Sequence, residues 1–580
     1  MPIMTMRRYE RVKGGMSRGV FVFCVTILVV HAVAEEVPLR TTFSNPIDIE
    51  YRRRPETTGY DFREAADPEI VLKDGRYWLF ASKCGGYFVS DDLIGWRFLT
   101  AKGLPFEEYA PTVETIGGKL NYSARGGTVD REIDAASGRW ERIKGCMAHT
   151  CDSALFRDED GRLYCYWASD PEGKRPISGC ELDPVTFADL TQPQSLMEEG
   201  VLRYGWEVRG HCNDRTDKPS YIEGPHMIRR GLTYYLQYAG PGTEWDGYCD
   251  TALTGPSPLG PFARQRMNPF SFKPTGYVRG AGHGKTFSDK YGNWWHVTTC
   301  VIQGVNRRLV MFPVFFDVDG EMWCDTAFAD WPIRVPDRKV SDPQGFRTGW
   351  MELTVGKCAV ASSTCPGSKV EDALDRNART SWSASGGQGE TFQVDLGGLA
   401  VVRAVQIGFD DVGEKYHGRH PENAILFRVE ASDDGLDWRT VVDRSENDRE
   451  AEHPYFELAK PEKARHLRIV CLGLPKGQNF ALREFRAFGS MDKSKPAVVH
   501  GLRALRDSGD RRHVSLFWMP APDVTGYLIR YGVNKKKMHL SYVTSGTSLE
   551  IRSLDAEENY VWSICGFNEA GFGPVGEGSF

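Results

Sequence analysis

The 580-residue sequence has no surplus of basic residues, and after its N-terminal segment it has no long apolar run. It carries 72 Lys and Arg against 78 Asp and Glu, and this net charge of −6 offers no basic surplus for nucleic acid or an anionic membrane. After residue 34 no apolar run is long enough to cross a bilayer. We therefore predict no nucleic-acid partner and no membrane span. Hydrophobic residues at 41% and charged residues at 26% are globular usage and exclude a disordered or coiled-coil chain.

The 14 cysteines do not follow the paired C-x-x-C spacing of a zinc finger. One of them, Cys24, lies in the N-terminal segment described next. The odd number that is left requires at least one thiol that is free or paired between chains. Cys146 with Cys151, and Cys358 with Cys365, are close enough in sequence to be disulfide candidates. The sequence leaves their pairing open.

The N-terminal segment has the layout of a secretory signal. Basic residues up to Arg18 precede the uncharged apolar run Val20–Val30, and Ala32 and Ala34 supply the small residues of a cleavage site. Residues 1–34 are therefore predicted to be a signal peptide that is cleaved after Ala34, in a secreted or periplasmic protein. A buried helix and an uncleaved anchor are the alternatives.

Helical periodicity is scarce, and short strand-like runs separated by Gly, Asp and Asn predict an all-β protein. An irregular repeat combines an apolar strand, a tight turn and an aromatic-rich strand. Its five copies start at Asp67, Tyr109, Cys151, Glu223 and Gly282. Five such hairpins predict a five-bladed β-propeller over residues 45–345. In such a fold the starts of the innermost strands converge on one mouth of a central channel.

Four of the five strand starts carry a polar group, and the second start, Ala110-Pro111, is apolar. The polar groups are Asp67, Asp152, Glu223 and His283. A carboxylate at a buried, converging position costs desolvation free energy unless it has a partner or a task. Three carboxylates facing one cavity would raise one another's pKa, and such differences between carboxyls are what acid/base catalysis uses.

The motifs around these residues resemble those of the family 43 glycoside hydrolases, which are five-bladed propellers. The resemblance covers about residues 45–334 and rests on Ala66-Asp67-Pro68, CDSALFRDEDGRLY, IEGPHM and GAGHGKTF, in the family's order. It implies that Asp67 is the general base, Glu223 the general acid, and Asp152 the group that orients Glu223 and keeps its pKa high. His283 would organise the channel floor through water or a bound cation. No cofactor would be required for the chemistry.

The resemblance further implies a secreted, inverting exo-glycosidase. Its two carboxyls would lie about 6.5–9.5 Å apart with a water between them. The substrate would be a polysaccharide or oligosaccharide with terminal α-L-arabinofuranose, β-D-xylose or galactofuranose, and the sequence leaves the sugar and linkage open. One alternative is an inactive carbohydrate-binding propeller or adhesin. The other is a fructan-acting sister family, whose R-D-P and E-C motifs are not matched here.

Each site residue also has a structural alternative. Asp67 could be a turn residue, Asp152 an Asx turn, and His283 a satisfied buried histidine. Glu223 could pair with the arginines at positions 229 and 230. Several aromatic residues could stack on sugar rings or pack in the core instead: Tyr87, Phe106, Trp206 and Trp245. An insertion-like stretch, residues 203–216, precedes the predicted acid.

Two smaller β modules are predicted to follow. Residues 350–490 resemble a discoidin or coagulation-factor type C domain, a jelly-roll sandwich whose bacterial relatives bind galactose-like sugars and hold calcium. That resemblance implies a structural calcium at Asp375, Thr380 and Glu484, although Arg376 stands where a glycine is usual. Residues 495–580 resemble a fibronectin type III domain, an immunoglobulin-like sandwich that normally spaces other domains. A polar linker over 490–501 would join the two.

Overall fold

The computed structural model describes residues 40–53, 62–198, 202–303 and 306–577. The predicted signal peptide lies outside these ranges. Within them the regular structure consists of strands and short 3-10 turns without an α-helix, so the all-β fold class is confirmed. No helix in the described ranges has the length and hydropathy that a membrane-spanning helix needs.

The first part of the chain forms five antiparallel sheets in chain order, each built on four strands. They are β4 (Ala66–Lys73), β5 (Arg76–Ser82), β6 (Tyr87–Ser90) and β7 (Arg97–Leu99); β8 (Thr112–Ile116), β9 (Lys119–Ser123), β10 (Thr128–Asp134) and β11 (Arg139–Cys146); β12 (Ala154–Arg157), β13 (Leu163–Ala168), β14 (Ile177–Leu182) and β15 (Gln194–Ser195); β16 (Glu223–Arg230), β17 (Thr233–Gly240), β18 (Cys249–Gly255) and β19 (Ala263–Arg264), with β20 (Ser271–Phe272) beside β18; and β21 (Gly282–Ser288), β22 (Trp294–Gln303), β23 (Asn306–Phe316) and β24 (Met322–Cys324).

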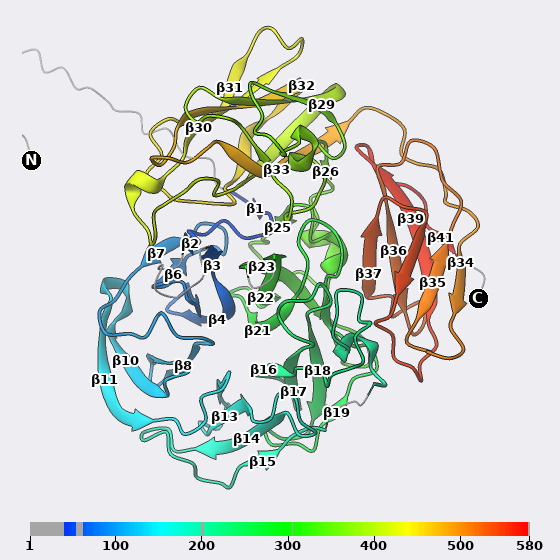
Figure 1. Ribbon diagram of the computed structural model, residues 1–580. Coiled ribbons are helices and arrows are strands. Elements are labelled where there is room, and N and C mark those ends of the chain that lie inside the picture. The colour runs from blue at the N-terminus through cyan, green and yellow to red at the C-terminus, as the bar shows by residue number, and fades with distance from the viewer. Residues whose placement is uncertain (1–39, 54–61, 199–201, 304–305, 578–580) are drawn as a thin grey trace, which may run out of the picture. The chain divides into compact units, whose positions relative to one another are not determined.

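The first strands of the five sheets contact one another in sequence. β4 contacts β8, β8 contacts β12, β12 contacts β16, β16 contacts β21, and β21 returns to β4. Figure 1 shows these strands toward the centre and β11, β15 and β19 toward the periphery. None of the described sheets closes on itself, and we call this arrangement of β4 to β24 the five-sheet ring. A five-bladed propeller would have its sheets in this order.

Short pairings complete the ring. β1 (Thr42–Phe43) pairs with β25 (Ile333–Arg334), and β2 (Arg52–Arg53) pairs with β3 (Arg63–Glu64). Aromatic side chains fill the space between neighbouring sheets, as between the first and second. Tyr87 and Phe106 belong to this cluster, and Trp206 is buried in another cluster, with residues of the last segment. These three residues are therefore core residues and not sugar-stacking ones.

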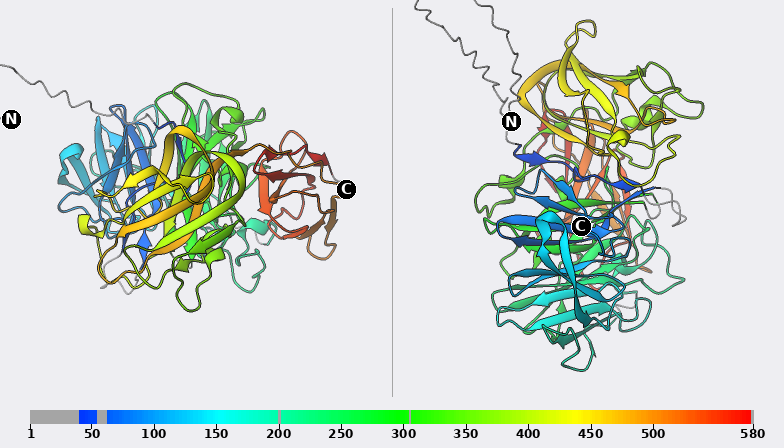
Figure 2. Two further views of the ribbon diagram at one scale, coloured as in Figure 1. Left: turned by 90° about the horizontal axis from the view of Figure 1, so that it is seen from above. Right: turned by 90° about the vertical axis from the view of Figure 1, so that its left-hand side faces the viewer.

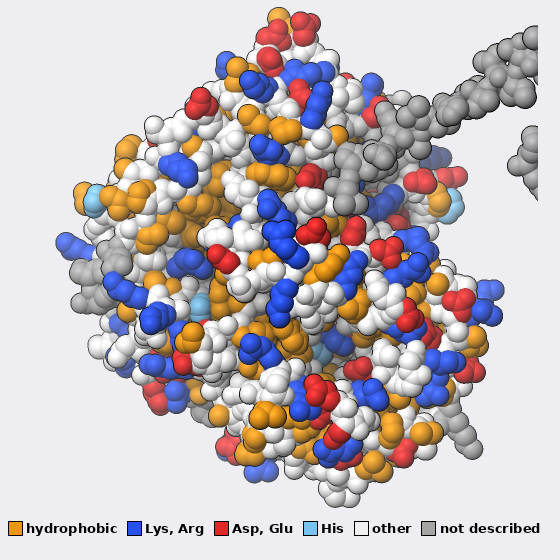
Figure 3. All heavy atoms as spheres, turned by 180° about the vertical axis from the view of Figure 1, so that it is seen from behind, with side chains coloured by type: hydrophobic (Ala, Val, Ile, Leu, Met, Phe, Trp, Pro, Cys, Tyr) orange, Lys and Arg blue, Asp and Glu red, His pale blue; other side chains and the backbone are white. Residues whose placement is uncertain are grey.

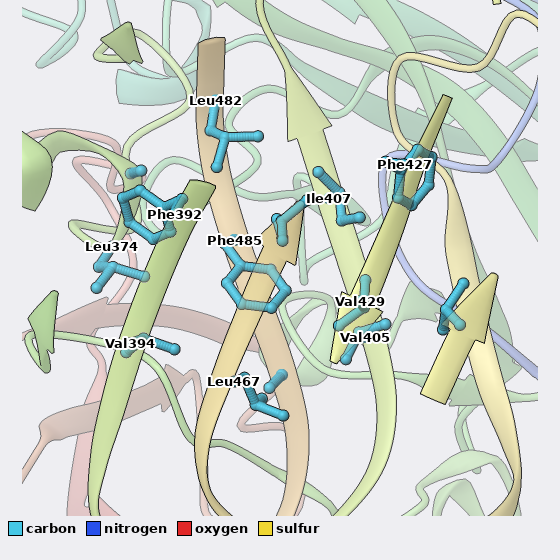
Figure 4. Close-up of a cluster of buried hydrophobic side chains, with 14 of the residues drawn as sticks. Leu374, Phe392, Val394, Val405, Ile407, Phe427, Val429, Leu467, Leu482 and Phe485 are labelled. Atoms are coloured by element: carbon cyan, nitrogen blue, oxygen red, sulfur yellow. The ribbon is translucent and has the colours of Figure 1, made fainter. Parts of the chain in front are cut away.

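The next segment forms one set of eight paired strands. They are β26 (Met351–Glu352), β27 (Cys358–Ala361), β28 (Trp382–Ser383), β29 (Thr391–Phe409), β30 (Leu426–Ser432), β31 (Arg439–Arg444), β32 (Tyr455–Gly473) and β33 (Ala481–Met491). Along β29 the buried residues alternate as Phe392, Val394 and Leu396, which is the period-2 pattern of a half-buried strand. Figure 4 shows Phe392 and Val394 in the same cluster as Phe427 and Phe485 from other strands.

The last segment forms two sheets. One holds β34 (Arg503–Arg506), β35 (Val514–Phe517) and β38 (Ser548–Ile551). The other holds β36 (Gly526–Gly532), β37 (Leu540–Thr544), β39 (Val561–Asn568), β40 (Gly571–Phe572) and β41 (Gly576–Glu577). Between them Trp518 is buried, and the Tyr560 hydroxyl accepts a hydrogen bond from Asp555 N at 3.1 Å. Figure 2 shows the strands of this segment in orange and red. The fibronectin type III identity stays a prediction.

This last segment packs closely on the ring. Trp206 and Phe272 of the ring share a buried cluster with Tyr542, and the rings of Phe272 and Tyr542 lie 5.9 Å apart. The insertion-like stretch takes part, because Arg203 pairs with Asp555 through two hydrogen bonds of 3.0 Å. The segment is thus more than a spacer at the end of a linker.

All cysteines of the described ranges are free thiols. The two candidate disulfides, Cys146 with Cys151 and Cys358 with Cys365, are therefore not formed in this structure. The two pairs were predicted because their members are close in sequence, but closeness in sequence does not determine the side-chain geometry that a disulfide needs.

Candidate active site

The structure brings the four predicted site residues of the ring together around one pocket of about 250 Å³. The pocket lies where β4, β12, β16 and β21 begin. Its lining residues are Glu64, Asp67, Tyr109, Arg125, Cys151, Asp152, Tyr221, Glu223, Thr243, His283 and Arg307. Trp245, the remaining stacking candidate, is absent from this lining. It lies below the guanidinium of Arg215, 5.1 Å from the ring centre.

The same backbone feature recurs at the start of each of the five first strands. One residue there has a left-handed φ: Asp67 at 49°, Ala110 at 45°, Asp152 at 50°, Gly224 at 54° and His283 at 50°. β-Bulges accompany it in β4, β16 and β21. Non-glycine residues in this region cost about 1–3 kcal/mol each, and such strain is typical of functional sites. A bulge of this kind changes the direction in which the side chains at a strand start point.

Asp67 is held by groups that favour its ionised form. Ser82 Oγ donates to Asp67 Oδ2 at 2.6 Å, and Arg307 Nη1 donates to both carboxylate oxygens at 3.1 and 3.2 Å. His283 Nδ1 lies 3.4 Å from Asp67 Oδ1. Burial alone would raise the pKa of Asp67, but Arg307, His283 and the Ser82 hydrogen bond outweigh it and hold the pKa below its usual value. The structure thus contains an ionised carboxylate at this position.

Glu223 has the opposite environment. Burial, the negative charge of Asp152 and the more distant charge of Asp67 raise its pKa well above the usual value, against a single lowering hydrogen bond from Tyr248 at 2.7 Å. Arg229 does not neutralise Glu223, because Arg229 Nη1 pairs with Asp158 at 2.7 Å. These neighbours favour the protonated form of Glu223.

His283 is positioned through its backbone. Asp250 accepts hydrogen bonds from His283 N at 2.8 Å and Gly284 N at 3.0 Å, and His296 Nε2 lies 2.8 Å from the same carboxylate. A Cβ at Gly224 would come within 2.5 Å of His283 Cγ, so the imidazole occupies the space that only glycine leaves. Donor atoms of His283, Asp152 and Glu223 lie within 4.8 Å of one another, close enough to share a water or a cation.

Three residues that act directly on the carboxyls were not predicted: Arg307, Ser82 and Tyr248. Arg307 also pairs with Glu64, through hydrogen bonds of 2.9 Å and 2.5 Å to one carboxylate oxygen. Ser82 ends β5, and Tyr248 ends the loop that follows β17. None belongs to a strand-start motif, so the pattern that revealed Asp67 and Glu223 could not reveal them.

The loop that carries Tyr248 and the pocket residue Thr243 is anchored through Asp246. Arg279 Nη1 lies 3.3 Å from Asp246 Oδ2, and Arg379 Nη1 donates to the same oxygen at 3.2 Å. Arg379 belongs to the segment between β27 and β28, so that segment contributes to the position of the loop. Arg379 also donates to Ile302 O at 2.9 Å.

The predicted calcium residues lie together at one end of the eight-stranded segment. Thr380 Oγ1 donates to Asp375 Oδ2 at 2.8 Å, and Glu484 Oε1 accepts from Arg376 N at 3.2 Å. Glu484 is fully buried, and its Oε2 has no hydrogen-bond partner among the described residues. Burial and the charge of Glu352 raise the pKa of Glu484 well above its usual value. Arg486 opposes this shift, and both Arg486 and Arg376 pair with Glu352. The oxygen donors of Asp375, Thr380 and Glu484 are of the kind that a hard cation binds.

Comparison with known proteins identifies two of the segments. Residues 63–322 match the model of glycosyl hydrolases family 43. The ring holds a family 43 domain. Residues 359–485 match the F5/8 type C domain, which agrees with the predicted discoidin-like module.

Two characterised relatives match the family 43 domain only in part. A beta-D-galactofuranosidase of Aspergillus niger is 22% identical over 237 residues, which cover 34% of this chain and 63% of that protein. A non-reducing end alpha-L-arabinofuranosidase of Bacteroides ovatus is 29% identical over 107 residues, 17% of this chain and 20% of that protein. The chain thus spans less than two thirds of the length of either. A solved thermostable family-43 glycoside hydrolase is 20% identical at a TM-score of 0.40, covering 49% of this chain and 96% of its own.

Proposed function

We propose that the protein is an inverting exo-glycosidase that releases a terminal sugar from a polysaccharide or oligosaccharide. One observation carries the proposal. Two carboxyls in one pocket, Asp67 and Glu223, have pKa values displaced in opposite directions by their neighbours. Hydrolysis of a glycoside by inversion needs one ionised carboxylate and one protonated carboxyl, and this pair supplies both.

In the proposed reaction Asp67 takes a proton from a water molecule as the water oxygen bonds to the anomeric carbon. Glu223 gives its proton to the glycosidic oxygen as the bond between that oxygen and the anomeric carbon breaks. Asp152 keeps Glu223 protonated by charge repulsion, and Arg307 keeps Asp67 ionised. Proton exchange with solvent then restores both carboxyls.

The pocket supports action at a chain end. The pocket at the starts of the first strands, with a volume of about 250 Å³, has the size for one sugar ring and is too small for a longer segment of a glycan. The relatives' names suggest the sugar. We propose α-L-arabinofuranose first, with β-D-galactofuranose and β-D-xylose as the further candidates.

The test compares the intact protein with Glu223→Gln and Asp67→Asn on nitrophenyl α-L-arabinofuranoside, β-D-xyloside and β-D-galactofuranoside. We expect release of nitrophenol from at least one glycoside and a loss of about 10²–10⁴-fold in kcat/KM in each variant, because each removes one proton-transfer group. Arg230→Ala, outside the pocket, serves as the control. A full rate in Glu223→Gln, or no release by the intact protein, would favour the inactive carbohydrate-binding alternative.

Analysis of the first product tests inversion separately. The sugar is expected to appear with the anomeric configuration opposite to that of the substrate, because a water and not Asp67 attacks the anomeric carbon. A retained configuration would contradict the general-base role of Asp67.

Three further assignments belong to the proposal. The F5/8 type C segment would bind galactose-like sugars and hold a structural calcium at Asp375, Thr380 and Glu484. The last segment would be a fibronectin type III domain. The protein would reach the periplasm or the exterior after cleavage behind Ala34.

A further inference from the structure

The pocket lining includes an arginine, Arg125, that has no role in the proposed reaction. Arg125 lies in the turn between β9 and β10, is exposed, and lines the pocket beside Asp152 and Cys151. Among the described residues its side chain has no ion pair and no hydrogen bond. Its charge nevertheless acts inside the pocket, because it lowers the pKa of the Cys151 thiol against burial and Asp152, which raise it.

Arg125 differs in this respect from the other arginine of the pocket. Arg307 is buried and its charge is balanced by Glu64 and Asp67, at N–O distances of 2.5 and 3.1 Å. Arg307 therefore serves the catalytic carboxylate. The guanidinium of Arg125 remains available to a group that enters from the solvent side.

Two further cations lie over aromatic rings of the pocket lining. Lys83 Nζ is 4.0 Å from the ring centre of Tyr109, and the guanidinium carbon of Arg209 is 5.8 Å from that of Tyr221. Both tyrosines line the pocket. Lys83 also donates to Glu107 O, and Arg209 is paired with Glu172, so neither offers its charge as freely as Arg125. On the face drawn in Figure 3, basic and acidic side chains are interspersed.

We propose that the natural substrate is an acidic glycan, and that Arg125 binds a carboxylate or sulfate on the sugar next to the one that is released. This inference rests on the proposed glycosidase function and names its substrate class. A planar guanidinium without a counter-charge forms paired hydrogen bonds with a carboxylate or sulfate. The carboxyl-rich floor holds the uncharged terminal sugar, so the anion belongs to the leaving group at the rim.

The experiment compares Arg125→Ala and Arg125→Lys with the intact protein, with Arg97→Ala as an exposed arginine of the ring outside the pocket. The substrates share the terminal sugar that the protein releases. Their leaving groups are nitrophenol, a neutral oligosaccharide, a uronic acid oligosaccharide and a sulfated oligosaccharide. The last two distinguish the two sources of negative charge.

For Arg125→Ala we expect kcat/KM on one of the acidic substrates to fall about tenfold, mainly through KM, with a clearly smaller change on the nitrophenyl and neutral substrates. Arg125→Lys should recover part of the loss, and added salt should reduce the preference of the intact protein. A wild-type preference for the neutral oligosaccharide, or an equal loss on all four substrates, would overturn the proposal.

A binding measurement keeps the two proposals separable. Calorimetric titration of the acidic oligosaccharides into Glu223→Gln, with and without Arg125→Ala, does not depend on turnover. If the protein cleaves no glycoside but binds the acidic glycan through Arg125, the enzymatic proposal fails and the recognition stands. If the protein cleaves nitrophenyl glycosides but does not prefer substrates with an acidic leaving group, the glycosidase proposal stands and the proposed role of Arg125 is wrong.

Discussion

Asp67 and Glu223 are both enclosed carboxyls, and their neighbours decide which of them is ionised. Arg307 places a positive charge beside Asp67, Ser82 donates a hydrogen bond to it, and His283 Nδ1 lies 3.4 Å away. For Glu223 the charge of Asp152 has the largest electrostatic effect, and the Tyr248 hydroxyl donates one hydrogen bond at 2.7 Å. The pH dependence of the proposed reaction follows from these contacts.

Two substitutions should move the alkaline limb of the kcat/KM profile in opposite directions. The Tyr248 hydrogen bond lowers the pKa of Glu223, so Tyr248→Phe raises that pKa further and extends activity to higher pH. The charge of Asp152 raises the same pKa, so Asp152→Asn brings the limb to lower pH and costs about a hundredfold in rate. Profiles of both variants on one nitrophenyl glycoside provide the measurement. Shifts in the same direction would contradict the assignment of Glu223 as the acid.

The residues that could be predicted share a position. Asp67, Asp152, Glu223 and His283 each stand at a strand start, where a polar group in front of an apolar run is visible in the sequence. The residues that were not predicted lie elsewhere: Arg307 in β23, Ser82 at the end of β5, and Tyr248 in the loop after β17. No motif around Arg307 shows that it pairs with a carboxylate 240 residues away in the sequence. The two residues come together only when the fifth sheet packs against the first.

At the scale of single elements, the five hairpins were predictable because the apolar runs and turn residues repeat. The predicted starts at Asp67 and Glu223 fall within or at the first residue of β4 and β16. The outermost strands were not predictable. β15 is two exposed residues and carries no alternation, so its pairing with β14 is decided by the neighbouring strand.

The loop before β28 supports a prediction about calcium. Arg376 stands in a left-handed conformation, with φ of 59°, where the resemblance expected glycine, and its guanidinium pairs with Glu352 at 2.9 Å. The side chain therefore points at Glu352, while the backbone keeps the turn that brings Asp375 near Glu484. Replacing the usual glycine does not displace the oxygen donors.

Chelation should therefore lower the melting temperature of the protein by several degrees, and added calcium should restore it. A ligand that binds only the folded form at a hundred times its Kd stabilises by about 2.7 kcal/mol. Thermal scans with EDTA, with EDTA plus excess calcium, and with magnesium in place of calcium provide the measurement. Asp375→Asn should show a smaller response. An unchanged melting temperature in EDTA would remove calcium from the proposal.

At the scale of the whole chain, the contacts between segments could not be predicted. The polar residues 490–501 indicated a linker between independent modules. The structure instead buries Arg308 of the ring against Glu452 of the F5/8 segment, with hydrogen bonds of 2.6 and 2.7 Å. Both residues are almost fully enclosed. The sequence shows that both residues are charged. It does not show that they pair, because their contact depends on the folds of both segments.

This buried pair makes stability depend on pH in a defined direction. Burial raises the pKa of Glu452, but Arg308 and His453 outweigh it, so the folded-state pKa lies below the ordinary value of 4.5. The stabilisation is therefore complete above about pH 4.5 and is lost as the pH falls through the lower folded-state pKa. Glu452→Gln leaves Arg308 buried without a counter-charge, which should cost about 3–5 kcal/mol in the free energy of unfolding at pH 7.

Denaturant unfolding of the intact protein and Glu452→Gln between pH 7 and pH 3 tests this. The difference in the free energy of unfolding should be largest at neutral pH and should shrink in acid, because the intact protein then loses the charge that the variant never had. Glu446→Gln, an exposed position of the same segment, should follow the intact protein throughout. A difference that stays constant down to pH 3 would mean that Glu452 contributes through packing, and that the charge of the pair does not hold the two segments together.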